Sequence, residues 1–255
     1  MTEEHDVFRP TPKHPTGLDA KTYVASLPQF CVSSKQTLPP SPLPDDVIRQ
    51  GIAITGGGLM GVSISAAFIK SGIPVLMYDV VPEVLATAPN RVAAELALQM
   101  PDADPFQLHE AMSLFETTDD MRRLARFDLI VESIYEKPKI KQKHYTALDS
   151  VRDRGGYILS NTSTIRIGKL AEVFAPKCKQ LSDANFCGFH FFHPVRERSL
   201  VEIIRGQATS DETISLAAAT ARLIGKTPII VHDGPGFLVN RLLNPYLNEA
   251  LVLLE

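Results

Sequence analysis

Residues 51–79 read GIAITGGGLMGVSISAAFIKSGIPVLMYD, and this stretch decides the fold. A short apolar run over 52–55 meets three consecutive glycines, and a segment with helical apolar periodicity follows over 59–69. A second apolar run over 74–78 ends in an acidic residue, Asp79. This order predicts a buried strand, a tight glycine turn, a helix, a second strand and a carboxylate at its end.

The glycines in this stretch have the G-x-G-x-x-G spacing of a phosphate-binding turn. Gly56 permits the tight turn, Gly58 lets a pyrophosphate approach the backbone, and Gly61 lets the helix pack on the strand. Leu59 and Met60 are the first residues of the predicted helix. The first turn of a helix presents unpaired N–H groups and the positive end of the helix dipole to a phosphate. We therefore expect these five residues to bind a dinucleotide, whereas the alternative is a purely structural glycine turn.

Asp79 lies about 20 residues beyond the turn, where a carboxylate accepts hydrogen bonds from the hydroxyl groups of an adenosine ribose. The same carboxylate repels a 2′-phosphate, and residues 80–82 offer no arginine that would bind one. The sequence therefore predicts NAD as the cofactor in preference to NADP.

The composition excludes several classes of protein. With 255 residues, 44% hydrophobic and 22% charged, the chain is expected to be an ordinary soluble globular protein. Its net charge of -3 does not favour binding to nucleic acid or to an acidic membrane, and no apolar run reaches membrane-spanning length. The N-terminal sequence lacks the pattern of a secretory signal. The sparse cysteines suit reduced thiols in the cytoplasm: Cys31, Cys178 and Cys187.

Three regions are predicted along the chain. Residues 1–48 hold eight of the 19 prolines and little periodicity, which indicates an irregular arm or, alternatively, a docking segment for another chain. Residues 49–235 are expected to form the NAD-binding domain. Residues 236–255 are strongly apolar and helical in pattern, with Pro245 expected to kink the helix.

Strands and helices alternate through the predicted domain. Further strands are predicted at 114–117, 128–132, 157–160, 186–192, 200–204 and 228–231, and further helices at 82–100, 105–112, 121–125, 137–152 and 215–224. This alternation predicts an α/β fold with a Rossmann-type, doubly wound, mainly parallel sheet. No helix separates 186–192 from 200–204, so these strands are expected to form a hairpin-like pair.

Four polar clusters follow the predicted strands or lie near the end of the chain. They are ESIYE at 132–136, SNTST at 160–164, HFFHP at 190–194 and NR at 240–241. In an open parallel sheet, ligands bind beyond the carboxyl ends of the strands, which favours these clusters as a site. Taken singly, each has a structural alternative: SNTST is also typical of a helix N-cap, and a histidine in an apolar run is often a core residue.

Glu202 is unusual because it lies within the apolar strand LVEII. A buried carboxylate is costly unless it is paired, and His190 on the neighbouring strand is the available partner. Oxidation of an alcohol by hydride transfer requires a base for the hydroxyl proton, a role that suits histidine near neutral pH. A carboxylate behind the histidine holds its tautomer and stabilises the imidazolium. The pair predicts a dehydrogenase.

A metal site is the rival interpretation, because Cys187, His190 and His193 form a C-x₂-H-x₂-H string. In a strand, however, Cys187 and His190 point to opposite faces, and no fourth ligand is apparent. We therefore predict no metal.

Read together, the motifs GIAITGGGLMG, VESIYE, SNTST, GFHFFHPV, LVEII and GKTPIIVHDGPGFLVNRLL resemble the L-3-hydroxyacyl-CoA dehydrogenase family over residues 49–255. The resemblance implies NAD-dependent oxidation of the 3-hydroxyl group of acyl-CoA thioesters, as in fatty-acid β-oxidation. It implies that His190 is the catalytic base, that Glu202 is its partner, and that Ser163 binds the substrate's 3-oxygen. It also implies that Asn240 helps to hold the substrate and the histidine, and that Glu136 lies near the nicotinamide.

The same motifs make Glu132 and Asn161 expected cofactor contacts. The sequence departs from the family in having His193 where the family has asparagine, in HFFNP. The family chain also continues into a helical domain that closes the acyl-CoA pocket and forms most of the dimer interface. Here at most the first helix of that domain is present, so the fold class includes a C-terminal helix from an otherwise missing helical domain.

Three functions compete at this stage. The first is a cytoplasmic 3-hydroxyacyl-CoA dehydrogenase, and the second is an NAD-binding module or structural protein with little or no turnover. The third is a dehydrogenase for another hydroxyl substrate on the same fold. A homodimer is expected through the apolar side chains of the C-terminal helix: Leu242, Leu243, Leu247, Leu251, Val252 and Leu254.

Overall fold

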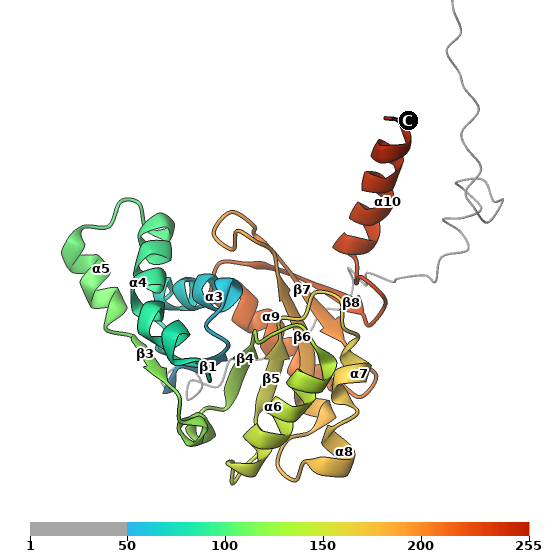
Figure 1. Ribbon diagram of the computed structural model, residues 1–255, viewed down its shortest axis with the longest axis horizontal. Helices are drawn as coiled ribbons and strands as arrows, with labels where there is room; N and C mark the ends of the chain where they lie inside the picture. The colour runs from blue at the N-terminus through green and yellow to red at the C-terminus, as the bar shows by residue number, and fades with distance from the viewer. Residues whose placement is uncertain (1–49, 255) are drawn as a thin grey trace, which may run out of the picture. The chain divides into compact units, whose positions relative to one another are not determined.

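The computed structural model describes residues 50–254, and the predicted N-terminal arm lies outside them. Within this range, strands form one sheet in the order β3-β2-β1-β4-β5-β6-β7-β8 (Figure 1). The strands are β1 Ile52–Thr55, β2 Val75–Tyr78, β3 Phe115–Thr118, β4 Leu129–Glu132, β5 Tyr157–Ser160, β6 Phe186–Phe191, β7 Leu200–Arg205 and β8 Thr227–His232. The strand order reverses between β1 and β4, which is the switch point of a doubly wound fold. The predicted fold class is confirmed.

The sheet changes direction between β6 and β7. The strands β3, β2, β1, β4, β5 and β6, in this order across the sheet, are all parallel to one another. The next strand, β7, is antiparallel to β6, and β8 is parallel to β7. The expected hairpin-like pair is thus present. Its register places His190 directly opposite Glu202.

The helices are α3 Leu59–Lys70, α4 Pro82–Gln99, α5 Pro105–Met112, η1 Met121–Arg126, α6 Pro138–Ser150, α7 Ile167–Ala171, α8 Phe174–Lys177, η2 Asp183–Asn185, α9 Asp211–Leu223 and α10 Val239–Val252. Several of these helices differ from those that the sequence predicts. The segment at 121–126 is a 3₁₀ helix, and the sequence pattern does not predict the short helices α7 and α8. Helix α9 begins earlier than its apolar periodicity indicates, because Ser210 is an N-cap: its side chain accepts a hydrogen bond from the N–H of Thr213 at 3.1 Å.

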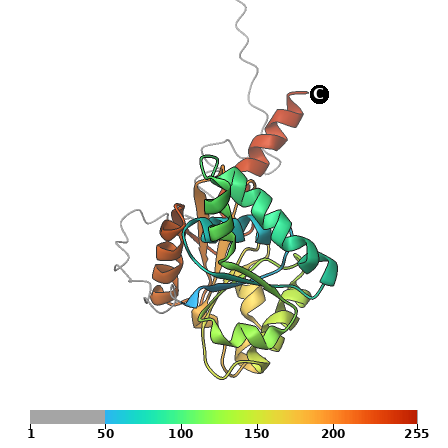
Figure 2. The same cartoon turned by 90° about the vertical axis from the view of Figure 1, so that its left-hand side faces the viewer.

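Helices cover both faces of the sheet (Figures 1 and 2). Apolar residues of α3, α4 and α9 pack with one set of strand residues, and those of η1, α6, α7 and α8 pack with the opposite set. Successive strand residues alternate between the two layers, as Ile52 and Ala53 do in β1. The two apolar layers hold the sheet rigid, so the carboxyl ends of its strands can position a site.

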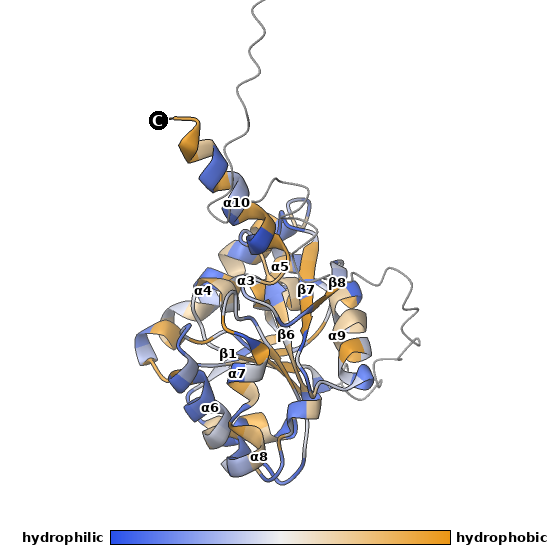
Figure 3. Cartoon of the chain, turned by 90° about the vertical axis from the view of Figure 1, so that its right-hand side faces the viewer, coloured by the Kyte–Doolittle hydropathy of each residue, from blue (hydrophilic) through white to orange (hydrophobic). Residues whose placement is uncertain are grey.

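Apolar residues are distributed along the terminal helix α10 (Figure 3). Their side chains are exposed. Leu242 is 67% exposed, Tyr246 71% and Leu251 63%, and no residue of α10 is buried within the described part of the chain. Pro245 lies inside the helix. Among residues 50–254, no helix combines the length and apolar character needed to cross a membrane.

Candidate active site

The turn between β1 and α3 requires glycine at two positions for steric reasons. Gly56 has a φ of 99°, and a Cβ on it would lie 2.4 Å from the carbonyl oxygen of Ser133. A Cβ on Gly61 would lie 1.8 Å from the carbonyl oxygen of Gly56, so α3 can approach β1 only without a side chain. By contrast, no atom of residues 50–254 lies within 4 Å of a Cβ built on Gly58. The backbone at Gly58 is therefore open to a ligand, whereas Gly61 serves helix packing.

Asp79 follows β2 directly and reaches back to the turn. One carboxylate oxygen, Oδ2, accepts the N–H of Gly57 at 2.7 Å, and Oδ1 accepts the N–H of Val81 at 3.0 Å. The carboxylate is thereby held beside the glycine turn at the edge of a pocket. It lies where the ribose of a dinucleotide bound to this turn is placed in doubly wound folds.

A pocket of about 1210 Å³ lies beyond the carboxyl ends of the strands. It brings together most of the residues expected at the site: Gly56, Gly58, Leu59, Met60, Asp79, Glu136, Asn161, Ser163, His190 and Asn240. His193, the residue that departs from the family pattern, also lines it. Gly61, Glu132 and Glu202 do not line the pocket and act from behind its wall. A single space therefore contains both the dinucleotide turn and the predicted base.

His190 and Glu202 form a hydrogen-bonded pair. His190 Nδ1 lies 2.7 Å from Glu202 Oε2, and the two side chains are 7% and 0% exposed. When Nδ1–H donates to the carboxylate, the lone pair of the imidazole is on Nε2. The ring packs against Phe192 and Phe237, with centroid distances of 4.6 and 5.8 Å. The pair thus presents to the pocket an imidazole that is held in one orientation.

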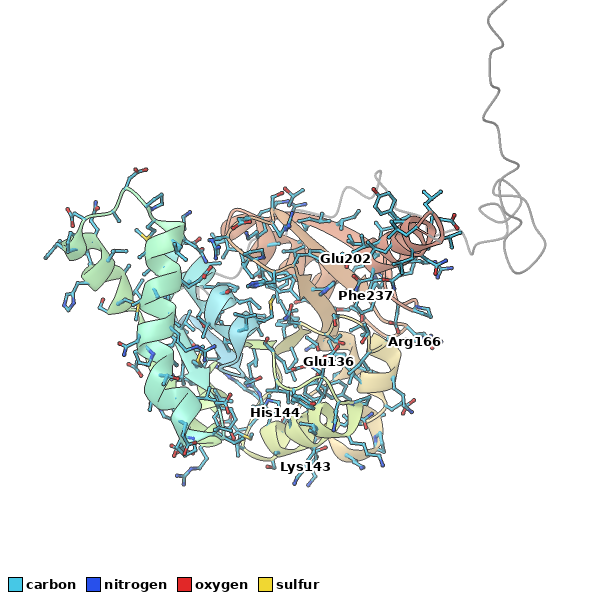
Figure 4. All side chains as sticks on the ribbon, turned by 45° about the horizontal axis from the view of Figure 1, so that its top comes forward. Glu136, Lys143, His144, Arg166, Glu202 and Phe237 are labelled. Atoms are coloured by element: carbon cyan, nitrogen blue, oxygen red, sulfur yellow. The ribbon has the colours of Figure 1, made fainter. Side chains whose placement is uncertain are left out.

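The second oxygen of Glu202 holds the beginning of α10. Oε1 accepts the N–H groups of Leu238 and Val239, each at 2.9 Å. These are donors that a helix start leaves unpaired, so the carboxylate satisfies them. Phe237 precedes them with a φ of 51° and is 1% exposed. Figure 4 shows Glu202 and Phe237 together, with Glu136 between them and His144.

The SNTST segment after β5 is held by side chains from other elements. Asn161 Oδ1 accepts the N–H of Phe191 at 2.9 Å, and Asn240 Nδ2 donates to the carbonyl oxygen of Ser163 at 3.3 Å. The alternative role as an N-cap is excluded, since no side chain of this segment caps α7. Asp233 instead accepts the first amides of that helix, from Ile167 and Gly168, at 2.8 Å each.

Glu136 fixes the backbone of the same segment. Its Oε1 accepts the Thr162 hydroxyl at 2.6 Å and the N–H of Ser163 at 2.9 Å, while Oε2 lies 3.3 Å from Lys141 Nζ. Burial raises the pKa of Glu136, but the positive charge of Lys141 and the hydrogen bonds outweigh burial, so the pKa lies below its ordinary value. Glu136 is therefore an anion at neutral pH, and its fixed charge lies in the pocket wall.

Glu132, an expected cofactor contact, has its side chain directed away from the pocket. Its side chain is fully buried, and four donors occupy its oxygens: Lys141 Nζ at 2.5 Å, the N–H of Ile134 at 2.8 Å, the Tyr145 hydroxyl at 2.6 Å and the Ser160 hydroxyl at 2.8 Å. The side chain of a glutamate at the end of a strand can point either into the pocket or into the protein interior. Glu132 points into the interior, where it contacts Lys141 and Tyr145 of α6. Glu132 supports the site from within.

Sequence reasoning missed two residues on α6. Lys141 is fully buried between the carboxylates of Glu132 and Glu136, whereas lysine side chains are mostly exposed. His144 lines the pocket and stacks on Tyr78 at 6.1 Å, and burial lowers its pKa, so it is neutral. Both follow Pro138 at helical spacing, but the sequence alone does not show which side of α6 faces the pocket.

The candidate metal string does not assemble. In β6, Cys187 belongs to the apolar layer, while His190 pairs with Glu202. Among residues 50–254, no group of three or more histidine, cysteine or acidic side chains is arranged to hold a metal ion.

The residues of the turn fit a dinucleotide. The open backbone at Gly58, the carboxylate of Asp79 and the amides at the start of α3, which have no acceptor within the described part of the chain, offer a phosphate cradle next to a ribose acceptor. The imidazole of His190 lies in the same pocket. Fold and site together define the NAD-binding domain of a dehydrogenase.

The particular family follows from the sequence match. Residues 51–234 match the NAD-binding domain of 3-hydroxyacyl-CoA dehydrogenases, and the chain belongs to this family. The expected resemblance and the NAD cofactor are thereby confirmed.

Several solved structures are similar to the chain. (S)-3-hydroxybutyryl-CoA dehydrogenase PaaH1 from Ralstonia eutropha has 33% identity and a TM-score of 0.72 over 78% of this chain and 69% of that one. FadB2 of M. tuberculosis has 29% identity and a TM-score of 0.72 over 79% and 70%. The 3-hydroxybutyryl-CoA dehydrogenase from Escherichia coli K12 has 29% identity and a TM-score of 0.71 over 78% and 42%.

Proposed function

We propose that this protein is an NAD-dependent L-3-hydroxyacyl-CoA dehydrogenase. The observation that carries the proposal is the pairing of His190 with Glu202 in the pocket that also contains the dinucleotide turn. The substrate class rests on family membership and on structural neighbours that are 3-hydroxybutyryl-CoA dehydrogenases. Acyl-CoA is therefore the proposed partner, within fatty-acid β-oxidation in the cytoplasm.

The chemistry follows from the atoms available. Bound NAD⁺ supplies the acceptor for a hydride from C3 of the substrate. His190 Nε2 takes the proton of the 3-hydroxyl group, so that the C–H and O–H bonds break while the C3–oxygen double bond forms. Glu202 stabilises the resulting imidazolium through its 2.7 Å bond to Nδ1. In the reverse reduction, His190 returns the proton to the oxygen.

Two residues are proposed to hold the substrate. Ser163 donates a hydrogen bond to the 3-oxygen, and this bond polarises the C3–oxygen bond while the proton moves. Asn240 holds Ser163 through its backbone carbonyl at 3.3 Å. Glu136 accepts the N–H of Ser163, so both backbone groups of the serine are hydrogen-bonded, one in each of its two flanking peptides. Asn161 and Glu136 are also proposed to lie next to the cofactor, because both line the pocket.

The test is the loss of reduced-nicotinamide absorbance with acetoacetyl-CoA as the keto substrate. His190→Gln and Glu202→Gln are each expected to lower kcat by about 10²-fold or more, while NADH binding to His190→Gln stays unchanged. His232→Gln is the matched control, because His232 is exposed at the end of β8 and lies outside the pocket. Turnover by His190→Gln at the wild-type rate would refute the assignment of the base.

The second candidate is an NAD-binding module with little turnover. It is favoured by the apolar side chains of α10 that no described residue covers. Tight NADH binding by wild-type protein, without turnover of acetoacetyl-CoA at any concentration, would support this candidate over the first.

A further inference from the structure

Gly57 is the residue of the glycine turn that the G-x-G-x-x-G pattern leaves unassigned. It is buried, and a Cβ on it would lie 2.6 Å from Val84 Cγ1 of α4 and 3.1 Å from Met77 Sδ of β2. Both of its backbone groups are bonded. Its N–H donates to Asp79 Oδ2 at 2.7 Å, and its carbonyl oxygen accepts from Arg91 Nη1 at 2.8 Å. The two peptide planes on either side of Gly57 therefore cannot rotate freely.

Arg91 reaches the turn from the middle of α4. The guanidinium is partly buried, and it forms no ion pair with a carboxylate among residues 50–254. Its neighbour one turn later, Glu95, pairs instead with Arg196 at 3.3 Å. A positive charge without a carboxylate partner in the described chain thus lies beside the phosphate-binding turn.

The bond from Arg91 decides where the next N–H points. In a trans peptide the carbonyl and the following N–H point in opposite directions. Because the Gly57 carbonyl faces Arg91 on α4, the N–H of Gly58 faces away from α4. That N–H bonds to no acceptor among the described residues, and Gly58 lines the pocket with open space beside it. It is available to a phosphate oxygen.

We propose that Arg91 is a positioning residue for the pyrophosphate of NAD. Arg91 holds the Gly57–Gly58 peptide so that the N–H of Gly58 is directed to the cofactor. The positive charge of Arg91, on the carbonyl side of this peptide, also favours the negative phosphates. The proposal concerns binding of the cofactor, so it stands or falls separately from the dehydrogenase activity. It also assigns a function to Arg91 of α4, which does not line the pocket and acts from behind its wall.

The test compares Arg91→Met and Arg91→Gln with the control Arg222→Met, which removes the same charge from an exposed position on α9. Dissociation constants are measured for NADH by its own fluorescence, and for ADP-ribose and adenosine by competition. We expect Arg91→Met to bind NADH and ADP-ribose about tenfold more weakly. Adenosine, which has no phosphate, is expected to bind as it does to wild type. Arg91→Gln should recover part of the affinity, because the amide of the new side chain can donate to the Gly57 carbonyl.

Two results would overturn the proposal. One is NADH affinity of Arg91→Met that equals the wild-type value. The other is an equal loss for adenosine and NADH, which would indicate general damage to the domain rather than an effect at the phosphates. Unfolding of the unliganded proteins by denaturant shows whether each variant is folded. If Arg91→Met is not folded, the same comparison of NADH with adenosine in Arg91→Gln decides.

Discussion

Gly58 and Gly61 are three residues apart, yet a methyl group would meet opposite surroundings at the two positions. At Gly58 it would enter open space beside the pocket, and the backbone there has a φ of -69°, which suits any residue. At Gly61 it would collide with the backbone of Gly56. The fold thus requires glycine at position 61, and we propose that the cofactor requires it at position 58.

This difference predicts opposite phenotypes for two alanine variants. Gly58→Ala should leave the free energy of unfolding nearly unchanged but weaken NADH binding, because the methyl group occupies the space of the phosphates. Gly61→Ala should lower the free energy of unfolding by about 3 kcal/mol, because α3 must move away from β1. Denaturant unfolding and NADH fluorescence titration measure the two quantities. Equal destabilisation by both substitutions would contradict the assignment.

Individual residues of the site show which features of it can be predicted from the sequence. The pairing of His190 with Glu202 is predictable, because a carboxylate within an apolar strand requires a partner and the adjacent strand offers one. Lys141 is not predictable, because a lysine on a polar helix is normally solvated. Its burial depends on two carboxylates that the end of β4 and the following loop bring to the same point. For Glu132, the pattern indicates the strand end correctly but does not tell into which layer the side chain points.

At the scale of elements, Asp149 joins the end of α6 to the segment before β6. Its carboxylate accepts the N–H groups of Lys179, Gln180 and Leu181 at 2.7–2.8 Å and is 6% exposed. Burial raises the pKa of Asp149, but the three backbone donors and Arg152 outweigh burial and lower it below the ordinary value. No sequence pattern indicates this connection, because the segment lacks periodicity.

Asp149 should therefore contribute to stability in a pH-dependent way. Its contribution is fully present above about pH 3.9, the pKa of aspartate in the unfolded chain, and is lost as the pH falls through the lower pKa of the folded protein. Asp149→Asn should lower the free energy of unfolding by about 2 kcal/mol at neutral pH, since an amide nitrogen cannot accept from Lys179. The difference from wild type should shrink in acid.

Urea unfolding at a series of pH values measures this dependence. Asp153→Asn, at an exposed position in the same region, removes an equal charge without these bonds and is the control. A difference between Asp149→Asn and wild type that grows as the pH falls would contradict the assignment.

The elements themselves are predictable where their periodicity is strong. The parallel strands β1, β2, β4 and β5 are short, mainly apolar runs between glycine or polar turns. Each of them, and the more polar β3, lies within a residue or two of its expected position. The short helices α7 and α8 escape prediction because they have at most five residues and because neither has an N-cap residue whose own side chain caps the helix. Helices this short have too little sequence to show a period.

At the scale of the whole molecule, the exposed apolar side of α10 predicts self-association. We expect a homodimer in which α10 of each copy contributes to a two-fold interface. The double substitution Leu247→Glu and Leu251→Glu should convert it to a monomer, because charges would be buried in the interface. Sedimentation equilibrium measures the mass. Asn244→Glu, which adds one charge at a polar position of the same helix, is the control.

Two outcomes would count against this prediction. One is a wild-type protein that remains monomeric at high concentration. The other is a double variant that keeps the mass of the dimer. NADH binding should be the same in all three proteins, because these positions lie outside the pocket.

The two oxygens of Glu202 connect this assembly to the chemistry. One is bonded to His190 and the other to the first amides of α10. If α10 tilts so that its amides leave the carboxylate, the geometry of Glu202 against His190, the proposed base, changes with it. We therefore expect the orientation of the terminal helix to influence the activity of the histidine. A partner that docks against α10 and holds it in place is expected to act, from outside the pocket, as an activator.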